Sequence, residues 1–328
     1  MIRWVITGAA SGFGRAVTEA ALGRGDAVIA VDVDRGGLDE LVGDARRLVR
    51  LQVDVRDAGA VERLGQEAVG GVDVLVNAAG YGLFGAQAAA SLDAVGAMLD
   101  TNLLGAVRVT RALLPALLAS RGCVVQLSSL AGRVTLPESG FYAASKHALE
   151  AVSEALFVEH AGSGLRVVLV EPGAFATGFA ARAARSSTLP VDVARPGAWD
   201  ALRARALAAP QDPALVVEAV FASVRPGGPG FQRVPVGVDA RRLLRARDLL
   251  GPDAWTLLLA RALGDGGPLP VGVATTAEVL ATATQDEAPP AVAAAVAAWA
   301  AGLLPEWEDE ALLAVLRTRA AAAEAAQG

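Results

Sequence analysis

The chain begins with a short β-branched run that leads into three closely spaced glycines and then into a helical pattern. The run Val5–Thr7 precedes Gly8, Gly12 and Gly14, and the helical pattern starts at Arg15. Glycines permit a tight turn and a close approach of the backbone to a pyrophosphate, and a helix N-terminus offers N–H groups and positive potential. The spacing, G-x-x-x-G-x-G, differs from the common G-x-G-x-x-G. We therefore expect a strand–turn–helix unit that binds a dinucleotide.

Strand-like and helix-like segments alternate along most of the chain. Several strand-like runs are apolar throughout, which is typical of a parallel sheet that is covered on both faces. Helical patterns occupy residues 91–119 and 140–162. The expected strands lie near residues 2–7, 27–32, 48–53, 72–77, 123–129, 165–171 and 231–237. This order predicts a doubly wound (Rossmann) α/β fold with a mainly parallel seven-stranded sheet and helices on both faces, and a ligand beyond the carboxyl ends of the strands.

Tyr142 and Lys146 stand four residues apart in a helical pattern, and Lys146 is the only lysine among 29 basic residues. At this spacing the two side chains share one helix face. An ammonium within roughly 4 Å would favour the phenolate by about 4 kcal/mol, or about 3 pKa units. We expect a proton-transfer pair in which Lys146 lowers the pKa of Tyr142. The alternative is an ordinary amphipathic helix with a core tyrosine and a solvated lysine.

An acidic residue ends the second expected strand. Asp32 follows Gly14 by eighteen residues, which is where a carboxylate would bind the ribose 2′-OH of NAD and repel a 2′-phosphate. Asp34 could share this role, and Arg35 could accommodate NADP. We expect NAD(H) to be preferred, with NADP(H) as the alternative.

Read together with further segments, the chain resembles the short-chain dehydrogenase/reductase family from Thr7 to about Asp239. The matching segments follow the family's order. They are TGAASGFG (7–14), the strand end at Asp32, Asp54-Val55, NAAG (77–80), Asn102, Ser128-Ser129, YAASK (142–146) and PGAFAT (172–177). One departure is visible, because the family commonly has Asn-Asn-Ala-Gly where this chain has alanine at position 78.

The resemblance implies a set of catalytic residues. Ser129 lies thirteen residues before Tyr142, the usual separation for the family's catalytic serine, and is preferred to Ser128. Ser129 would bind the substrate oxygen, and Tyr142 would be the general acid/base. Lys146 would tune Tyr142 and hold the nicotinamide ribose, and Asn102 would anchor a water molecule in a proton relay.

The resemblance also implies the groups that hold the cofactor. Asp54 and Val55 would contact adenine, Asn77 and Gly80 would line the cofactor cleft, and the loop from Pro172 would lie near the carboxamide. The complete expected set is Thr7, Gly8, Ser11, Gly12, Phe13, Gly14, Asp32, Asp54, Val55, Asn77, Ala78, Gly80, Tyr142, Lys146, Pro172, Gly173 and Thr177.

Apolar side chains adjoin these motifs and suggest a lipophilic substrate. The expected substrate contacts are Tyr81, Phe84, Leu130, Leu136, Phe175, Phe179 and Trp199. The last three fall in or near a Pro-, Arg- and Ala-rich stretch, residues 174–210, that we interpret as a lid. The alternative is that these aromatic rings only pack the lid on the body of the domain.

Composition excludes several classes of protein. A net charge of −6 and a pI of about 5.1 argue against a nucleic-acid surface. Two histidines and one cysteine leave no plausible metal site. We expect no secretory leader and no segment of about 20 apolar residues that would span a membrane. Together with the lone Cys123, these features predict a cytoplasmic protein.

We expect a catalytic domain over residues 1–250 and a C-terminal helical extension over 251–328, which packs on the domain or on a partner subunit. Within the extension, residues 291–304 and 306–325 have helical patterns. The family resemblance implies a homodimer or homotetramer.

The sequence therefore predicts an NAD(H)-dependent oxidoreductase that interconverts a secondary alcohol and a ketone on an apolar small molecule. Its motif segments are most similar to those of hydroxysteroid and retinol dehydrogenases. Two alternatives stay open. One is a redox-neutral epimerase or cyclase of natural-product metabolism, and the other is an NAD-binding sensor or scaffold.

Overall fold

The computed structural model describes residues 1–175, 177–179, 183–185, 211–250, 252 and 255–256. The chain divides into two units, one with Met1–Pro190 and Pro210–Gly237, the other with Val191–Ala209 and Val238–Gly328. The sheet and the expected site belong to the first unit. Trp199 and the expected helices at 291–304 and 306–325 lie outside the described residues. The domain boundary at residue 250 stays a prediction.

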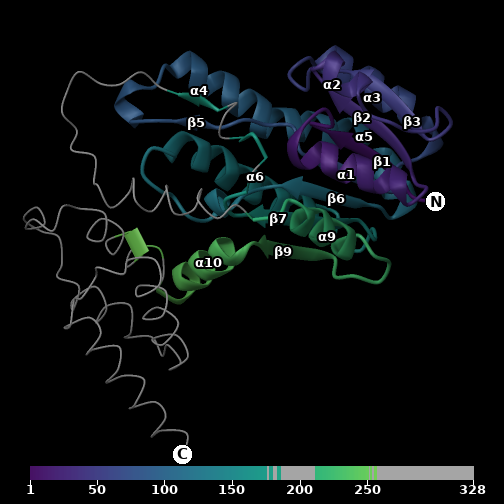
Figure 1. Cartoon of the computed structure of the whole chain (residues 1–328). Coiled ribbons are helices and arrows are strands. Elements are labelled where there is room, and N and C mark those ends of the chain that lie inside the picture. Colours follow the sequence, from purple (N-terminus) through teal and green to yellow (C-terminus); the bar gives the residue numbers. More distant parts are fainter. Residues whose placement is uncertain (176, 180–182, 186–210, 251, 253–254, 257–328) are drawn as a thin grey trace, which may run out of the picture. The chain divides into compact units, whose positions relative to one another are not determined.

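A seven-stranded sheet, parallel at every pairing, forms the centre of the first unit (Figure 1). The strand order is β3-β2-β1-β4-β6-β7-β9. The strands are β1 (Arg3–Thr7), β2 (Ala27–Asp32), β3 (Leu48–Gln52), β4 (Val74–Asn77), β6 (Cys123–Leu127), β7 (Arg166–Pro172) and β9 (Phe231–Val236). All seven expected strands are confirmed, and the central strands β1, β4, β6 and β7 are apolar runs buried on both faces.

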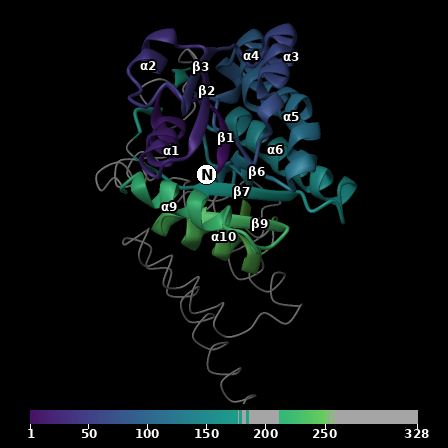
Figure 2. The same ribbon diagram turned by 90° about the vertical axis from the view of Figure 1, so that its right-hand side faces the viewer.

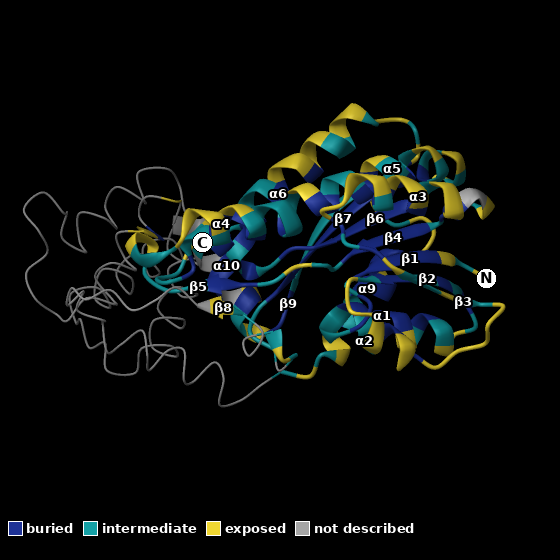
Figure 3. Cartoon of the chain, turned by 90° about the horizontal axis from the view of Figure 1, so that it is seen from above, coloured by how far each residue is buried: buried dark blue, intermediate teal, exposed yellow. Residues whose placement is uncertain are grey.

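Helices cover both faces of the sheet (Figure 2). One face carries α1 (Gly12–Gly23), α2 (Arg35–Asp39) and α9 (Ala214–Ser223), and the other carries α3 (Ala58–Glu67), α5 (Ala106–Ser120) and α6 (Gly140–Glu159). Figure 3 shows the buried strands between these layers and the exposed outer faces of the helices. The doubly wound architecture is therefore as expected.

Short elements complete the described part of the chain. They are η1 (Ala68–Gly70), β5 (Leu83–Phe84), η2 (Gln87–Ala89), α4 (Leu92–Leu99), η3 (Asp100–Gly105), η4 (Leu130–Gly132) and β8 (Ala184–Arg185) in the first unit, and α10 (Val238–Leu250) in the second. The helical pattern expected over 91–119 is confirmed as one helical stretch, within which η3 is a π-helical segment between α4 and α5. Such π-turns are frequent at functional sites.

One helical stretch, Leu92–Ser120, is long and apolar enough to cross a membrane by length and composition. In this fold it comprises α4, η3 and α5. Val109, Leu113 and Leu117 from α5 are buried in the core that lies on one face of the sheet. The core helix of a folded domain passes the same composition test.

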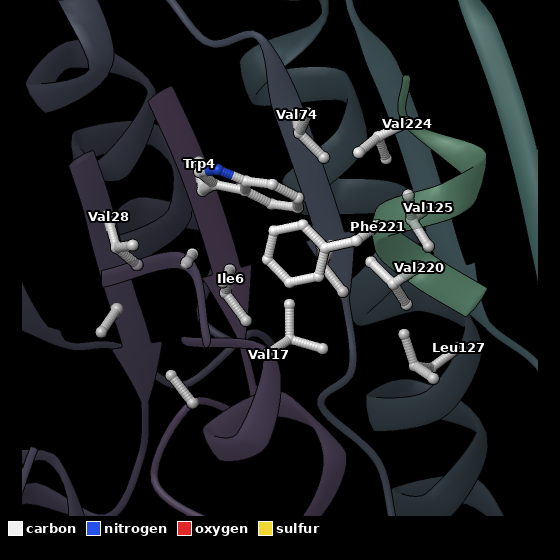
Figure 4. Close-up of a cluster of buried hydrophobic side chains, with 14 of the residues drawn as sticks. Trp4, Ile6, Val17, Val28, Val74, Val125, Leu127, Val220, Phe221 and Val224 are labelled. Atoms are coloured by element: carbon white, nitrogen blue, oxygen red, sulfur yellow. The ribbon is translucent and has the colours of Figure 1, made fainter. Parts of the chain in front are cut away.

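The core on the opposite face is centred on Trp4 and Phe221 (Figure 4). Their ring centroids lie 5.0 Å apart, and Val17 and Val220 pack around them. The indole nitrogen of Trp4 donates to Asp26 Oδ2 at 3.1 Å, so its one polar atom is satisfied. This contact joins β1 to α9, which are more than 200 residues apart in sequence.

Replacing Phe221 with alanine should therefore lower the free energy of unfolding by about 3–5 kcal/mol, because a buried aromatic ring is lost and a cavity is left beside Trp4. Chemical denaturation measures this loss. Leu215→Ala on the same helix is the matched control, since Leu215 is 38% exposed, and it should cost far less. Equal losses for the two variants would contradict this description of the core.

Candidate active site

The parallel sheet brings the expected site residues to one edge. Thr7, Asn77 and Pro172 are the last residues of β1, β4 and β7, and Ser129 follows the end of β6 by two residues. Because neighbouring strands run in the same direction, all these strand ends meet at their carboxyl edge.

The glycine-rich loop follows β1 and fits a dinucleotide. Gly8 and Gly12 have φ values of +69° and +56°, which other residues rarely adopt. A Cβ at Gly8 would lie 2.7 Å from the backbone carbonyl of Ala78, and one at Gly14 would overlap the carbonyl oxygen of Gly8. The loop is a close-packed turn of bare backbone that leads into the N-terminus of α1, and this is the cradle that a pyrophosphate requires.

Thr7 and Asp32, at the ends of β1 and β2, bind neighbouring backbone: Thr7 binds the loop after β4, and Asp32 binds the glycine loop. Thr7 Oγ1 accepts hydrogen bonds from the N–H groups of Ala78 and Ala79, both at 3.2 Å. Asp32 Oδ2 accepts from Ala10 N at 2.9 Å, and Oδ1 accepts from Asp34 N at 2.9 Å. The Asp32 carboxylate therefore lies at the end of β2 beside the glycine loop, where the sequence places it.

The neighbours of Asp32 have other partners. Asp34 caps α2 by accepting from Gly37 N at 3.1 Å. Arg35 pairs with Asp39 at 2.9 Å on the surface of the same helix. Both side chains of this pair are more than half exposed, so the contact is a weak surface ion pair.

Three other residues that we expect to bind the cofactor, Asp54, Val55 and Asn77, differ in burial and in their hydrogen-bond partners. Asp54 binds Arg56, and this hydrogen bond holds the pKa of Asp54 below its usual value. Val55 is buried, and a Cβ at Gly105 would lie 2.6 Å from its Cγ2. The Asn77 amide is turned into the core, where Nδ2 donates to Thr110 Oγ1 at 2.9 Å.

Two backbone regions complete the cofactor side of the site. Ser11 precedes α1 as its N-cap, and Phe13 lies in the first turn of that helix. After β7, Gly173 N donates to Val236 O at 3.0 Å, and Thr177 N donates to Phe175 O at 3.0 Å. The assignment of all these residues to cofactor binding stays a prediction.

Ser129, Tyr142 and Lys146 come together from the end of β6 and the first turns of α6. Tyr142 and Lys146 are only 8% and 7% exposed. The Ser129 side chain lies close enough to the Tyr142 phenol to lower its pKa, and Ser129 Oγ accepts from Ala131 N at 3.1 Å. Lys146 Nζ donates to the Leu127 carbonyl oxygen at 2.6 Å. The i, i+4 spacing thus places both side chains on the buried face of α6.

Burial dominates the proton affinities of this pair. Burial raises the pKa of Tyr142 to about 12, and the hydrogen bond with Ser129 opposes this rise. Burial lowers the pKa of Lys146 to about 8, and the charge of Glu150 opposes this fall. The expected lowering of the Tyr142 pKa by Lys146 is therefore wrong for this structure. The expectation included only the attraction between the charges and left out the cost of removing both groups from water.

Asn102 lies within the π-helical segment η3 and is 1% exposed. Its Oδ1 accepts from Tyr81 N at 3.0 Å, and its Nδ2 donates to Tyr81 O at 2.9 Å and to Ser145 Oγ at 3.1 Å. The Asn102 side chain therefore joins the loop after β4 to α6. A Cβ at Gly80 would lie 2.9 Å from Asn102 Oδ1, so this loop approaches the amide closely.

An aromatic and aliphatic cluster surrounds the ring of Tyr142. The ring centroids of Phe84 and Phe179 lie 5.6 and 5.5 Å from that of Tyr142 and 6.3 Å from each other. Leu83 and Met98 are buried in the same cluster, and Tyr81 packs against it. The strand pair β5–β8 holds Phe84 beside the segment that follows β7. These contacts make the surroundings of Tyr142 apolar.

Three other residues that we expect to contact the substrate, Phe175, Leu130 and Leu136, lie outside the aromatic cluster around Tyr142. Phe175 packs edge-on against Phe13 of the glycine loop, with ring centroids 5.6 Å apart. Leu130 is buried in η4, and Leu136 is half-buried.

Among the described residues, no group of three His, Cys, Asp or Glu side chains could hold a metal ion.

Sequence reasoning missed one set of polar residues near this site. Ser128 and Glu150 are hydrogen-bonded to each other behind Lys146, and Arg233 from β9 binds Glu150. A carboxylate four residues after the only lysine was a visible signal. Nothing in the sequence placed β9 beside α6.

Comparison with known proteins relates the chain to one group of enzymes. A family model described as short chain dehydrogenase matches residues 3–187. The 3-ketodihydrosphingosine reductase of Bacteroides thetaiotaomicron is 37% identical over 179 residues, which cover 53% of this chain and 64% of that protein. The match thus spans less than two thirds of that relative's length.

Solved structures share the fold over most of their length. A short-chain dehydrogenase from Streptomyces avermitilis is 35% identical with a TM-score of 0.65, covering 74% of this chain and 91% of that one. A short chain dehydrogenase from Burkholderia cenocepacia J2315 in complex with NADP is 26% identical with a TM-score of 0.63, covering 80% and 98%.

The close packing of the glycine loop leads to a stability prediction. Gly14→Ala should cost about 1–3 kcal/mol, because the new methyl group would overlap the backbone of Gly8. Gly23→Ala at the other end of α1 is the control, since a Cβ there meets nothing within 4 Å, and it should leave stability nearly unchanged. Thermal unfolding of both variants checks this, and a Gly14→Ala protein as stable as Gly23→Ala would rule out the close approach.

Proposed function

The chain belongs to the short-chain dehydrogenase/reductase family, and from this membership we propose that it is an NAD(P)-dependent oxidoreductase that interconverts a secondary alcohol and a ketone. The observation that carries the proposal is the placement of Tyr142 and Lys146 one turn apart on the buried face of α6, with Ser129 lowering the pKa of the Tyr142 phenol. This group lies at the same sheet edge as the glycine loop. A protein that only bound the nucleotide would need no such proton-transfer group beside it.

Each side chain has a distinct part in this chemistry. The nicotinamide, when bound, supplies or accepts the hydride. In the reducing direction Tyr142 donates its hydroxyl proton to the oxygen of the substrate, and Ser129 donates a hydrogen bond to the same atom. Lys146, as an ammonium, attracts the negative charge that Tyr142 acquires.

The high pKa of Tyr142 affects the two directions differently. With a pKa of about 12 the phenol is protonated at neutral pH, which suits the donation of a proton to a ketone. Oxidation of an alcohol requires the phenolate, whose population rises with pH.

We propose NAD(H) as the preferred nucleotide and NADP(H) as the alternative. Support comes from the Asp32 carboxylate beside the glycine loop. A carboxylate at this place binds a ribose 2′-OH and repels a 2′-phosphate. The relative from Burkholderia cenocepacia is in complex with NADP, so family membership does not by itself decide between the two nucleotides. In this chain we assign the preference for NAD(H) to Asp32.

The substrate that we propose is a mostly apolar ketone or secondary alcohol. Phe84, Phe179 and Leu83 surround the ring of Tyr142, so a substrate that reaches the phenol contacts hydrocarbon on the way. The Bacteroides relative is named as a ketone reductase acting on 3-ketodihydrosphingosine. Cytoplasmic location and homo-oligomeric assembly stay predictions.

Tyr142→Phe should reduce turnover at least about 100-fold, because the proton donor is lost while the ring and its packing are kept. Absorbance at 340 nm with NADH and a panel of hydrophobic ketones measures turnover, and fluorescence of bound NADH measures cofactor affinity, which should be unchanged. Tyr81→Phe, at the chain's other tyrosine, should keep most of the activity. Full activity of Tyr142→Phe would sink the assignment.

Asp32→Asn should lower the ratio of kcat/KM for NADH over NADPH by roughly tenfold or more, which is the effect of losing one charged hydrogen bond and one repulsive charge. The same ketone and the same 340 nm assay give both values. An unchanged ratio would assign nucleotide choice to other residues and would leave the redox assignment standing.

A further inference from the structure

A buried carboxylate that the proposed chemistry does not use lies directly behind the catalytic pair. Glu150 is one helical turn after Lys146 on α6 and is 4% exposed. Ser128 Oγ donates to Glu150 Oε1, and Arg233 Nε donates to Glu150 Oε2 at 2.9 Å. Both oxygens are therefore bound, one from the end of β6 and the other from β9.

Glu150 belongs to a larger charged cluster, formed by Lys146, Glu150 and Glu154 of α6, Glu171 of β7, Arg233 of β9 and Arg133, which follows η4. Glu171 is fully buried, with Oε1 3.7 Å from Arg133 Nη1 and 3.8 Å from Arg233 Nε. Arg233 also binds the exposed Glu154. Three carboxylates thus face two guanidinium groups, and Lys146 is the remaining basic group of the cluster.

Lys146 and Glu150 together hold the end of β6 against α6. Leu127 O accepts from Lys146 Nζ at 2.6 Å, and the next residue, Ser128, donates to Glu150. Two successive residues are thus attached to two positions one turn apart on the helix. The residue that follows them is Ser129, so this double attachment holds the backbone directly before the Ser129 hydroxyl.

The charge of Glu150 acts on Lys146 as well. Burial alone disfavours an ammonium at this place, and the nearby carboxylate opposes that cost. Glu150 is itself buried, which raises its pKa, but Ser128 and Arg233 both lower that pKa by bonding its charged form. With a guanidinium at 2.9 Å, we take Glu150 to be ionised at neutral pH.

We propose that Glu150 is a positioning residue for the catalytic centre, which orients Ser129 through Ser128 and keeps Lys146 in its charged form. The proposal rests on the proposed function, because it assigns Glu150 a part in preparing the same proton-transfer group. Glu150 itself touches neither the substrate nor the cofactor in this scheme.

Because Lys146 is the only lysine in the 328-residue chain, its titration can be followed without interference. In the NMR spectrum of the full-length protein labelled with ¹³C,¹⁵N-lysine, Lys146 gives the one lysine side-chain signal. The chemical shift of this signal, measured against pH, gives the midpoint of the Lys146 titration. The midpoint should fall by about one pH unit in Glu150→Gln, since a neighbouring opposite charge is lost. An unmoved midpoint in a folded Glu150→Gln protein would overturn the electrostatic part of the proposal.

Glu154→Gln is the matched control, because it removes the same charge from the same helix and also contacts Arg233, but Glu154 is exposed. The Lys146 midpoint should stay near the wild-type value in this variant. A fall equal to that of Glu150→Gln would attribute the effect to Arg233 or to net charge, and the role of Glu150 would be rejected.

The orientation of Ser129 is tested separately with Ser128→Ala, which removes the link to Glu150 and keeps every charge. We expect kcat for a reducible ketone to fall about tenfold, with little change in KM, because one neutral hydrogen bond is lost. The Lys146 midpoint should be unchanged. Wild-type kcat in Ser128→Ala would overturn this part of the proposal, and this variant carries the test if Glu150→Gln does not fold.

The two readouts separate this proposal from the proposed function. The lysine titration needs no substrate, so it tests Glu150 even if no ketone is turned over. Conversely, turnover that depends on Tyr142 together with an unmoved lysine midpoint would retain the oxidoreductase and reject Glu150 as its positioning residue.

Discussion

The parallel pairing of the strands is the constraint on which the site depends. Pairing of β1 with β4 and of β4 with β6 is in register from Trp4 to Thr7 and from Val74 to Asn77, so the three strands end together. Each strand end then continues into a segment with a chemical role: the glycine loop, the loop held by Asn102, and the turn that carries Ser129. A parallel sheet requires a crossover after each strand, and these crossovers supply α1 and α6.

The active-site pair illustrates the opposition between burial and charge. Tyr142 and Lys146 lie on one helix face, yet removal from water raises the pKa of the phenol and lowers that of the amine. Both shifts favour the neutral forms of the two groups. For Lys146, the charge that offsets this effect comes from Glu150, whose carboxylate is held by a hydrogen bond from Arg233 of β9. The catalytic helix thus depends on β9, which contributes no residue to the proposed chemistry.

Much of the fold and of the candidate site could be predicted from local patterns. The central strands are apolar runs that a doubly covered sheet can bury, and the glycine spacing indicates a turn of bare backbone next to a helix. The i, i+4 spacing correctly places Tyr142 and Lys146 on one face. By contrast, Asn102 lies in a π-helical segment with its amide bonded to the Tyr81 backbone and to Ser145, and Phe175 packs on Phe13 instead of beside Tyr142. These are contacts between distant segments that carry no local signal.

The sequence by itself determined the order of strands and helices, the glycine turn, and the residues that can transfer a proton, because these follow from side-chain period and chemical type within short windows. Only the tertiary structure decided the proton affinities of Tyr142 and Lys146 and the engagement of Ser128, Glu150 and Arg233. A pKa depends on how much water is removed and on which charges lie within a few ångströms. Both are set by segments such as β6, α6 and β9 that meet only when the chain has folded.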